Sequence, residues 1–437
     1  MDWRTLCGKK LVSPEQALDL IQPSERVFIA GLQGTPFTLC QALITRRAEL
    51  RGLHLNTLVS LFDWNRPGLE EDFHFESWYL SRRERPLMHA GRLDYMPVSY
   101  FRAGVLPYGI DELDVYMVTV SAPDRHGFCS FGTSVGMSPL MLRRASRVIA
   151  EVDATLIRTG GENHVHVLEI DCFVERQGIP PPMSTPEVYS QEKQDAVDTI
   201  CMQIANDLIQ DGDTIQIGAG DMTSPLPNYL FGKHDLGMQT EIIPPGVVAL
   251  VQAGVLTGTR KTIHPGKVVG TAFHPLLSAE ELDFIDGNPV FELYDFNYTD
   301  DIRLLCQEPR FAAINNALTI DLTGQVASES LGPQMFTGPG GQTAFAIAAC
   351  LAGGKSIMAL PASSIVQGER LSRIVPVLTP GTVVTTPRAF VDYVVTEYGI
   401  ATLRGKNLRQ RAQELIAIAH PDFRTELQRE AARLYRI

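Results

Sequence analysis

The sequence has no uninterrupted apolar stretch of the roughly 18 residues that a transmembrane helix needs, so no membrane span is expected. Its N-terminus, MDWRTLCGKK, lacks the apolar core of a signal peptide. There is no C-x-x-C pair, and the seven cysteines are scattered and odd in number, which favours reduced thiols over a disulfide framework or a zinc site. Together these absences predict a cytoplasmic protein.

Positive charge is also scarce. The chain has 38 Lys and Arg residues against 50 Asp and Glu residues, which gives a formal net charge of −12, and the two signs are mixed along the sequence. Proteins that bind nucleic acid usually carry clustered basic residues. The charge therefore argues against nucleic acid or an anionic membrane surface as a partner, and it indicates no particular substrate.

With 437 residues the chain is too long for one typical core, so we expect two domains. The segment 177–186 holds four prolines in its last seven positions, a pattern that suits neither a helix nor a central strand. It is the best linker candidate, and it predicts an N-terminal α/β domain at 1–180 and a C-terminal catalytic α/β domain at 187–437.

Short β-branched runs alternate with longer helical patterns, which predicts an α/β fold with mostly parallel sheets. The predicted strands are 27–31, 148–152, 213–218 and 356–360. The predicted helices are 14–21, 38–51, 193–210 and 408–419. The stretches 15–34 and 196–220 share the order helix, Asp-Leu-Ile-Gln, strand and glycines, which suggests two related halves.

A glycine-rich loop runs from Gly338 to Gln342 and reads GPGGQ. Three glycines in four residues let the backbone approach a ligand closely and direct N–H groups at an anion, an oxyanion or a pyrophosphate. A plain tight turn explains the loop equally well. Neither a dinucleotide-binding G-x-G-x-x-G nor a phosphate-binding G-x-x-x-x-G-K-[ST] occurs in the chain.

Two further motifs have weaker support. The run from Gly132 to Gly136 matches G-x-S-x-G, which would make Ser134 the nucleophile of a serine hydrolase, but so short a pattern occurs often by chance. His164 and His166 alternate on a predicted strand, yet a metal site needs at least three converging ligands. We therefore predict no metal site.

Glu241 stands between LGMQT and IIPPG, just before a helical stretch. In these apolar and irregular surroundings a partly desolvated carboxylate would be a stronger nucleophile than one in water. Composition alone does not distinguish it from a surface or capping glutamate.

At this point the chain resembles a known family, the acetyl-CoA hydrolase/transferases, and within it the branch that includes 4-hydroxybutyrate CoA-transferase, a family I CoA-transferase. The resemblance runs in order along nearly the whole sequence. The matching segments include 120–127 (VSAPDRHG), 132–135, 148–152, 158–161, 166–171, 234–241 (HDLGMQTE), 320–332 (IDLTGQVASESLG), 338–345 (GPGGQTAF), 372–376, 394–406 (VVTEYGIATLRGK) and 418–424.

The resemblance implies two related open α/β domains with the active site between them, and Glu241 as the covalent nucleophile. It places the loop containing Gly338, Gly340 and Gln342 over the reacting thioester. Gly341, or less favourably Gly340, would offer its N–H to the oxyanion. Lys406 and Arg404 could meet a phosphate of coenzyme A (CoA), although surface roles fit them as well. No permanently bound cofactor is implied, because CoA is both substrate and covalent intermediate, and a homodimer or higher homo-oligomer is expected.

Three departures from the family pattern concern the site. The usual Ser-Asp-Gly after the catalytic glutamate is replaced by the run 243–246 (IPPG), and the acidic residue expected in the glycine loop is Ala344. Asp300 stands where an asparagine that stabilises an oxyanion is expected. Because a charged Asp300 would repel an oxyanion, either it is protonated, or it points away, or the register differs by one residue.

The sequence therefore predicts an enzyme that moves CoA between short-chain carboxylic acids, with ping-pong kinetics through a glutamyl-CoA thioester on Glu241 and with Gly341 and Asp300 beside it. Its expected partners are an acyl-CoA and a small carboxylate. The alternatives are an acyl-CoA hydrolase on the same scaffold, an acyl-CoA binding protein with impaired catalysis, and, last, a serine hydrolase that uses Ser134.

Overall fold

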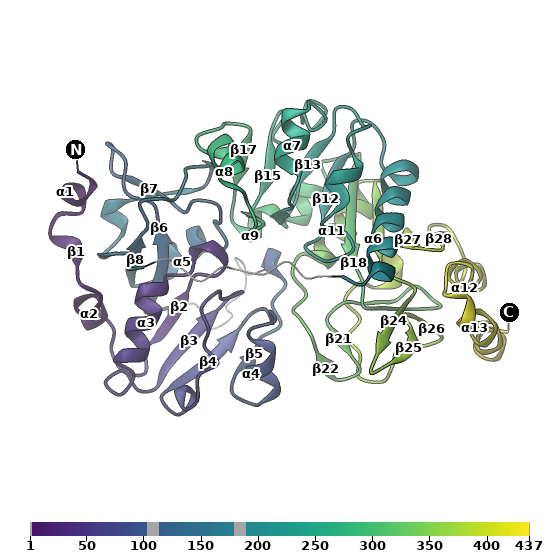
Figure 1. The fold of residues 1–437 in the computed structure, drawn as a ribbon, viewed down its shortest axis with the longest axis horizontal. Helices are drawn as coiled ribbons and strands as arrows, with labels where there is room; N and C mark the ends of the chain where they lie inside the picture. Colours follow the sequence, from purple (N-terminus) through teal and green to yellow (C-terminus); the bar gives the residue numbers. More distant parts are fainter. Residues whose placement is uncertain (1, 103–112, 179–188, 437) are drawn as a thin grey trace. The chain divides into compact units, whose positions relative to one another are not determined.

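The computed structural model describes residues 2–102, 113–178 and 189–436, so most of the predicted linker, 179–186, lies outside the described residues. The chain forms two compact units (Figure 1). The first is Met1–Thr185 with Val269–Thr299, and the second is Pro186–Val268 with Asp300–Ile437. These units differ from the predicted ranges 1–180 and 187–437 in one segment, 269–299, which packs with the first unit.

The physical reason is a set of contacts that the segment makes with distant parts of the first unit. The ring of Phe296 lies 4.5 Å from that of Tyr100. The carboxylate of Asp295 accepts the N–H of Leu140 at 3.1 Å and is almost fully buried. Such long-range packing has no signature in local composition, which is all that a linker prediction uses.

The first unit is built on a parallel sheet. Its described strands lie in the spatial order β1 (Leu11–Val12), β11 (Cys172–Glu175), β8 (Arg147–Val152), β6 (Val115–Val120), β2 (Arg26–Ile29), β3 (Leu53–Thr57), β4 (Phe73–Ser77) and β5 (Asp94–Tyr95). Every recorded pairing in this sheet is parallel. The strand order reverses between β2 and β6, the kind of switch point at which parallel α/β sheets bind ligands.

Short helices and smaller strands complete the first unit. The helices are α1 (Trp3–Cys7), α2 (Pro14–Ala17), α3 (Phe37–Thr45), α4 (Arg85–His89), α5 (Ser138–Arg144), α8 (Ala279–Ile285) and α9 (Phe296–Thr299). The additional strands are β7 (Phe128–Ser130), β9 (Gly160–Gly161), β10 (His164–His166), β15 (Val268–Gly270, at the boundary), β16 (Ala272–Phe273) and β17 (Phe291–Leu293). All six residues of β6 are buried, as expected for an apolar strand that is covered on both faces.

The second unit contains a further mainly parallel sheet. Its strands lie in the order β28 (Gly399–Thr402), β27 (Tyr393–Thr396), β23 (Lys355–Ala359), β18 (Phe311–Asn316), β12 (Thr214–Ile217) and β13 (Gly237–Gln239). All neighbours pair in parallel except β27 and β28, which form an antiparallel pair joined by a short turn. The prediction of an α/β fold with mostly parallel sheets is confirmed.

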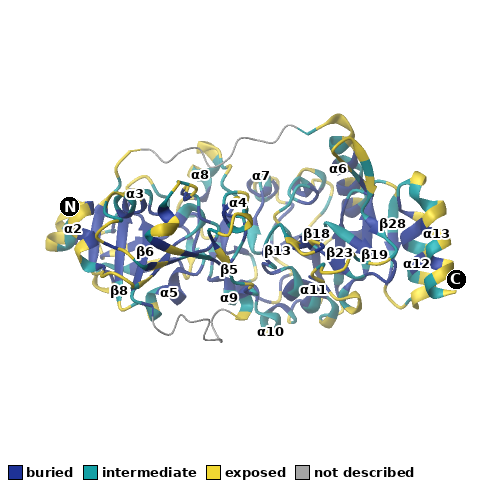
Figure 2. Cartoon of the chain, turned by 90° about the horizontal axis from the view of Figure 1, so that it is seen from below, coloured by how far each residue is buried: buried dark blue, intermediate teal, exposed yellow. Residues whose placement is uncertain are grey.

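Helices cover this sheet, and smaller strands extend from it. The helices are α6 (Gln191–Gln203), α7 (Val247–Gln252), α10 (Ile302–Leu305), α11 (Gln342–Leu351), α12 (Leu408–Ala417) and α13 (Pro421–Tyr435). The smaller strands are β14 (Ile242–Ile243), β19 (Thr319–Asp321), β20 (Val326–Ala327), β21 (Ser330–Leu331), β22 (Gln334–Met335), β24 (Ser363–Val366), β25 (Glu369–Ser372) and β26 (Ile374–Val375). Figure 2 shows the central strands β18 and β23 buried and the outer faces of α12 and α13 exposed.

The predicted strands coincide with β2, β8, β12 and β23 within one or two residues, whereas the helix ends differ more. The helix predicted to reach residue 51 ends at Thr45, and α6 continues as a π-helical turn, Ile204–Leu208. Among the described residues, no helix combines the length and the apolar character that crossing a membrane requires.

Candidate functional site

Glu241 follows strand β13 at the carboxyl end of the parallel sheet of the second unit. The preceding residue, Thr240, anchors this point, because its hydroxyl donates to the carbonyl of Ile217 on β12 at 3.2 Å. The buried ammonium of Lys261 donates to the carbonyl of Met238 at 2.8 Å and to the Gln239 side-chain oxygen at 3.3 Å. The backbone that presents the Glu241 side chain is therefore held on both sides.

The Glu241 carboxylate meets the N-terminus of helix α11. The N–H of Gly341, the N-cap residue of α11, donates to Oε2 of Glu241 at 2.8 Å. The helix is held in place because the Phe345 side chain packs in a buried cluster with residues of β18 and α10. The positive end of the helix dipole favours a negative charge at this position.

Gly341 is needed for this close approach. A Cβ at position 341 would stand 2.3 Å from Oδ2 of Asp300, 2.5 Å from a ring carbon of Phe345 and 2.7 Å from Oε2 of Glu241. All three distances are far below van der Waals contact. The sequence-predicted residues Glu241, Gly341 and Asp300 are thus brought together within the second unit.

Glu241 keeps some contact with solvent, but it lies among many protein atoms. The loss of hydration raises the pKa of Glu241 to about 7, and the N–H of Gly341 opposes that rise by stabilising the ionised form. A carboxylate with a pKa near neutrality is a better nucleophile than an ordinary glutamate and still ionises readily at pH 7.

Asp300 precedes the short helix α10, and its residue surface is fully buried. Its Oδ2 and Oε2 of Glu241 flank the same point above the α-carbon of Gly341. Of the three explanations that the sequence left open for Asp300, this geometry removes the one in which the side chain points away from Glu241. Two carboxyl groups this close in a poorly hydrated place do not both ionise readily.

The other predicted binding residues divide into two groups. Gly338 and Gly340 lie in the loop directly before Gly341, and Gly340 has a φ of +52°, a conformation that favours glycine. Gln342 begins α11, and its amide donates to the hydroxyl of Thr386 at 3.3 Å. Lys406 lies in the turn between β28 and α12, where its ammonium pairs with the carboxylate of Glu414. The structure therefore places Gly338, Gly340 and Gln342 beside Gly341 and gives Lys406 a structural partner.

A buried amide pair near the site went unnoticed in the sequence. The side chains of Gln216 on β12 and Asn315 on β18 exchange two hydrogen bonds, of 3.1 and 3.0 Å. A Cβ on Gly218 would stand 2.8 Å from the Asn315 side-chain oxygen, which explains the glycine after β12 by close packing. The available signal was the Asn315-Asn316 pair that follows the apolar start of β18.

The alternative motifs lack the partners that they need. Ser134 forms a backbone bridge with Ala272, and within the described part of the chain no group hydrogen-bonds to its Oγ. A triad would need a histidine at that atom. Over residues 2–102, 113–178 and 189–436, no group of three or more His, Cys, Asp or Glu side chains could hold a metal ion.

Comparisons with known proteins agree with the resemblance. Residues 1–183 match the acetyl-CoA hydrolase/transferase N-terminal domain, and residues 278–431 match the acetyl-CoA hydrolase/transferase C-terminal domain. The chain is 37% identical to the 4-hydroxybutyrate coenzyme A transferase of Clostridium kluyveri over 98% of this chain and 99% of that protein.

Solved structures are similar over the whole chain. RipA from Yersinia pestis superposes with a TM-score of 0.90 at 31% identity and covers 100% of both chains. The 4-hydroxybutyrate CoA-transferase of Porphyromonas gingivalis gives a TM-score of 0.79 at 32% identity and covers 99% of this chain and 100% of its own.

Proposed function

This chain belongs to the acetyl-CoA hydrolase/transferase family and is an acyl-CoA:carboxylate CoA-transferase, and we propose that it moves CoA between short-chain carboxylic acids through a thioester on Glu241. The observation that carries the role of Glu241 is its 2.8 Å hydrogen bond from the N–H of Gly341 at the start of α11. That N–H supplies a donor at the nucleophile in a poorly hydrated place.

In the first half-reaction, a carboxylate oxygen of Glu241 attacks the thioester carbonyl carbon of the acyl-CoA. The carbon–sulfur bond breaks, so an acyl-glutamyl anhydride forms and CoA leaves as the thiolate. The thiolate then attacks the glutamyl carbonyl and displaces the acyl group as its free carboxylate. The energy of the thioester bond is thereby kept on the enzyme as glutamyl-CoA.

The second half-reaction reverses these steps with another acid. The incoming carboxylate attacks glutamyl-CoA, the thiolate leaves, and the thiolate then takes the new acyl group from the anhydride and releases Glu241. Because the first product leaves before the second substrate reacts, the kinetics are ping-pong. Both anhydride steps require that water stays away from the glutamyl carbonyl.

We propose that Asp300 and Glu241 form a carboxyl pair that holds one proton, and that Asp300 carries this proton. Each step passes through a tetrahedral oxyanion, which an ionised Asp300 would repel and a protonated Asp300 could stabilise by donating its proton in a hydrogen bond. Gly341 would supply a second donor, because its N–H becomes available when the Glu241 carboxylate turns toward the substrate. The buried ammonium of Lys261 already donates to the carbonyl of Met238, in the strand that leads to Glu241.

The remaining site assignments are proposals of the same kind. Gly338, Gly340 and Gln342 would line the acyl-CoA thioester through the backbone of the loop. Lys406 could reach a CoA phosphate with donors that Glu414 leaves unused, since an ammonium has three. We also retain the expectation of a homodimeric, cytoplasmic enzyme.

The decisive experiment is intact-mass spectrometry of the purified protein after incubation with acetyl-CoA or butyryl-CoA in the absence of an acceptor acid. We expect a mass increase equal to one CoA less the water lost in forming the thioester. Glu241→Gln should lose the adduct. The matched control Glu280→Gln, which changes an exposed glutamate on α8, should keep it.

The other outcomes separate the alternatives. Steady release of CoA without an adduct would favour acyl-CoA hydrolysis on the same scaffold. Neither an adduct nor CoA release, across a panel of acyl-CoAs, would favour a binding protein with impaired catalysis. Adduct formation in the Glu241→Gln protein would refute Glu241 as the nucleophile.

A further inference from the structure

The first unit contains a cavity of about 410 Å³ along helix α3, apart from any residue named in the proposed reaction. This volume falls in the range of small-molecule sites. Its walls come from α2, from α3 and from the segments that follow β3, β4 and β11. The lining residues are Pro14, Glu15, Phe37, Thr38, Gln41, Ala42, Thr45, Phe62, Asp63, Arg66, Arg83 and Gln177.

Two arginines in this lining have no acidic partner among the described residues. The guanidinium of Arg66 lies 5.2 Å from the centre of the Phe62 ring and donates to the Gln41 side-chain oxygen at 3.2 Å. Arg83 is half-buried, and no group in the described part of the chain bonds to its guanidinium. A guanidinium is always charged and forms strong hydrogen bonds with carboxylates and phosphates. Two guanidinium groups without acidic partners therefore favour the binding of an anion.

The two acids of the lining are occupied locally. Glu15 and Asp63 are both exposed. Backbone N–H groups at the start of α2 and the Ser13 hydroxyl lower the pKa of Glu15, and Asp63 accepts the N–H of Asn65 at 3.0 Å. Neither acid forms an ion pair with Arg66 or Arg83. The half-buried positive charges thus remain available to a ligand.

Aromatic side chains form the apolar part of the cavity. The rings of Phe37 and Phe62 lie 6.1 Å apart with their planes tilted by 58°. The Arg176 guanidinium lies 6.0 Å from the centre of the Phe37 ring. Phe62 is buried and Phe37 half-buried, so the rings present a wall rather than a surface patch.

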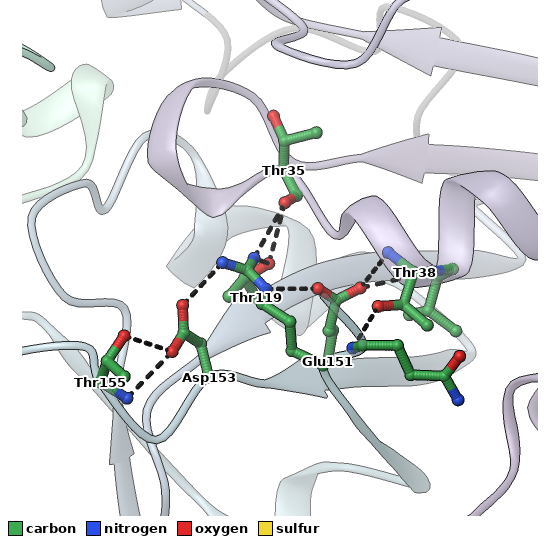
Figure 3. Close-up of polar contacts among 9 residues, drawn as sticks. Thr35, Thr38, Thr119, Glu151, Asp153 and Thr155 are labelled. Carbon is green, nitrogen blue, oxygen red and sulfur yellow. Dashed lines mark hydrogen bonds and ion pairs between the residues drawn. The ribbon is translucent and has the colours of Figure 1, made fainter. Parts of the chain in front are cut away.

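A buried polar network fixes the floor of the cavity (Figure 3). Glu151 accepts the N–H of Thr38 at 2.7 Å, and Arg176 lies 2.6 Å from both Glu151 and Asp153. The hydroxyl of Thr38 accepts the N–H of Gln177 at 2.9 Å. Because the Glu151 carboxylate already occupies the N-terminus of α3, an incoming anion would depend on the arginines. The walls are therefore preorganised for a ligand.

We propose that this cavity binds a small organic anion, whose carboxylate or phosphate contacts Arg66 and Arg83 and whose apolar or aromatic body packs on Phe37 and Phe62. The binding does not require turnover at Glu241, but a CoA source rests on the function proposed above. Two sources share this chemistry, a free carboxylic acid with an apolar body and the nucleotide end of CoA.

The test is isothermal titration calorimetry of the full-length protein, together with tryptophan fluorescence. Trp64 is a suitable reporter, because its ring lies 4.7 Å from that of Phe62. The probes are benzoate, adenosine 3′,5′-bisphosphate and inorganic phosphate. We expect one of the two organic anions to bind saturably and more tightly than inorganic phosphate, and the probe that binds identifies the source.

Variants locate the binding. Arg66→Gln and Arg83→Gln should each weaken it about tenfold, because each removes a charge-assisted contact. Ala42→Phe should block the cavity without changing charge, and Arg51→Gln, outside the lining, should leave binding intact. Unchanged thermal unfolding would show that the variants fold. No binding by any probe, binding by both arginine variants as tight as in the parent protein, or inorganic phosphate binding as tightly as the organic anions would overturn the proposal.

Discussion

Glu241 and Gly341 lie 100 positions apart in the chain, yet the N–H of Gly341 donates to Oε2 of Glu241 at 2.8 Å. Gly341→Ala would place a Cβ against Glu241, Asp300 and Phe345 at 2.3 to 2.7 Å. Alanine keeps the N–H, but the clash moves it away from Glu241, so we expect kcat in steady-state transfer assays to fall about 10²- to 10³-fold, as when an oxyanion donor is lost. The fold should remain, because the clash lies at a helix start.

The matched control is Gly232→Ala. A Cβ at that position would meet nothing within 4 Å, and Gly232 has no left-handed backbone conformation. Its kcat should equal that of the parent protein. An active Gly341→Ala enzyme would show that the close approach of this backbone is not needed for catalysis.

The carboxyl pair predicts a bell-shaped pH profile of kcat/KM. Activity should rise with pH as Glu241 ionises, since its pKa is raised to about 7, and fall again when Asp300 loses the shared proton. The Asp300→Asn protein has no ionisable side chain at position 300, so its kcat/KM should not fall at alkaline pH. The pH profiles of the two proteins, measured in the same buffers, give the comparison.

Asp301→Asn is the neighbouring control for that measurement. Asp301 caps α10 through the N–H of Arg303, so this change should affect stability more than the pH profile. If the parent enzyme stays fully active at alkaline pH, Asp300 does not carry a proton that matters to catalysis.

The raised pKa of Glu241 also predicts how stability depends on pH. The folded state holds this proton more tightly than the unfolded chain, so the folded protein loses stability as pH rises from about 4.5 to about 7. Glu241→Gln removes that cost. It should raise the free energy of unfolding by about 3 kcal/mol at pH 8 and change it little at pH 4, as measured by urea denaturation. An equal effect at both pH values would contradict the linkage.

Ser134→Ala tests the serine hydrolase alternative. Ser134 Oγ has no hydrogen-bond partner in the described part of the chain, so no base is in place to activate it. We expect kcat to stay within about twofold of the parent value in the transfer assay. A loss comparable to that of Glu241→Gln would restore Ser134 as a candidate nucleophile.

The fold class and the predicted strands were accessible from sequence because continuous apolar runs such as that of β8 are local signals. Glu241 and the glycine loop, in contrast, were selected through the resemblance to a family, because composition alone does not distinguish Glu241 from a surface glutamate. Their proximity has no local signal, because it depends on the pairing of β13 with β12 and on the packing of α11 against β18. The resemblance to a family supplied that relation.

Other features had no local signal. The segment 269–299 looks like any other part of the second half, but Asp295 and Phe296 anchor it in the first unit. The ion pairs of Arg176 link residues more than twenty positions apart, and only the fold brings them together. The early end of α3 at Thr45 had no local signal either, because most of the residues that follow it, RRAELR, are good helix formers.

The Arg176 network gives the last prediction. The side chain of Glu151 is 0% exposed and that of Arg176 11%, so removing the cation would leave a buried carboxylate without its partner. We expect Arg176→Met to lower the free energy of unfolding by about 3–5 kcal/mol in urea denaturation, whereas Arg433→Met, which breaks an exposed pair with Glu430, should cost less than about 1 kcal/mol. Glu151→Gln combined with Arg176→Met should recover part of the loss, because the amide needs no counter-ion. A double variant that loses the sum of the two single effects would mean that the two side chains contribute separately, rather than as a pair, to the floor beneath Phe37 and Thr38.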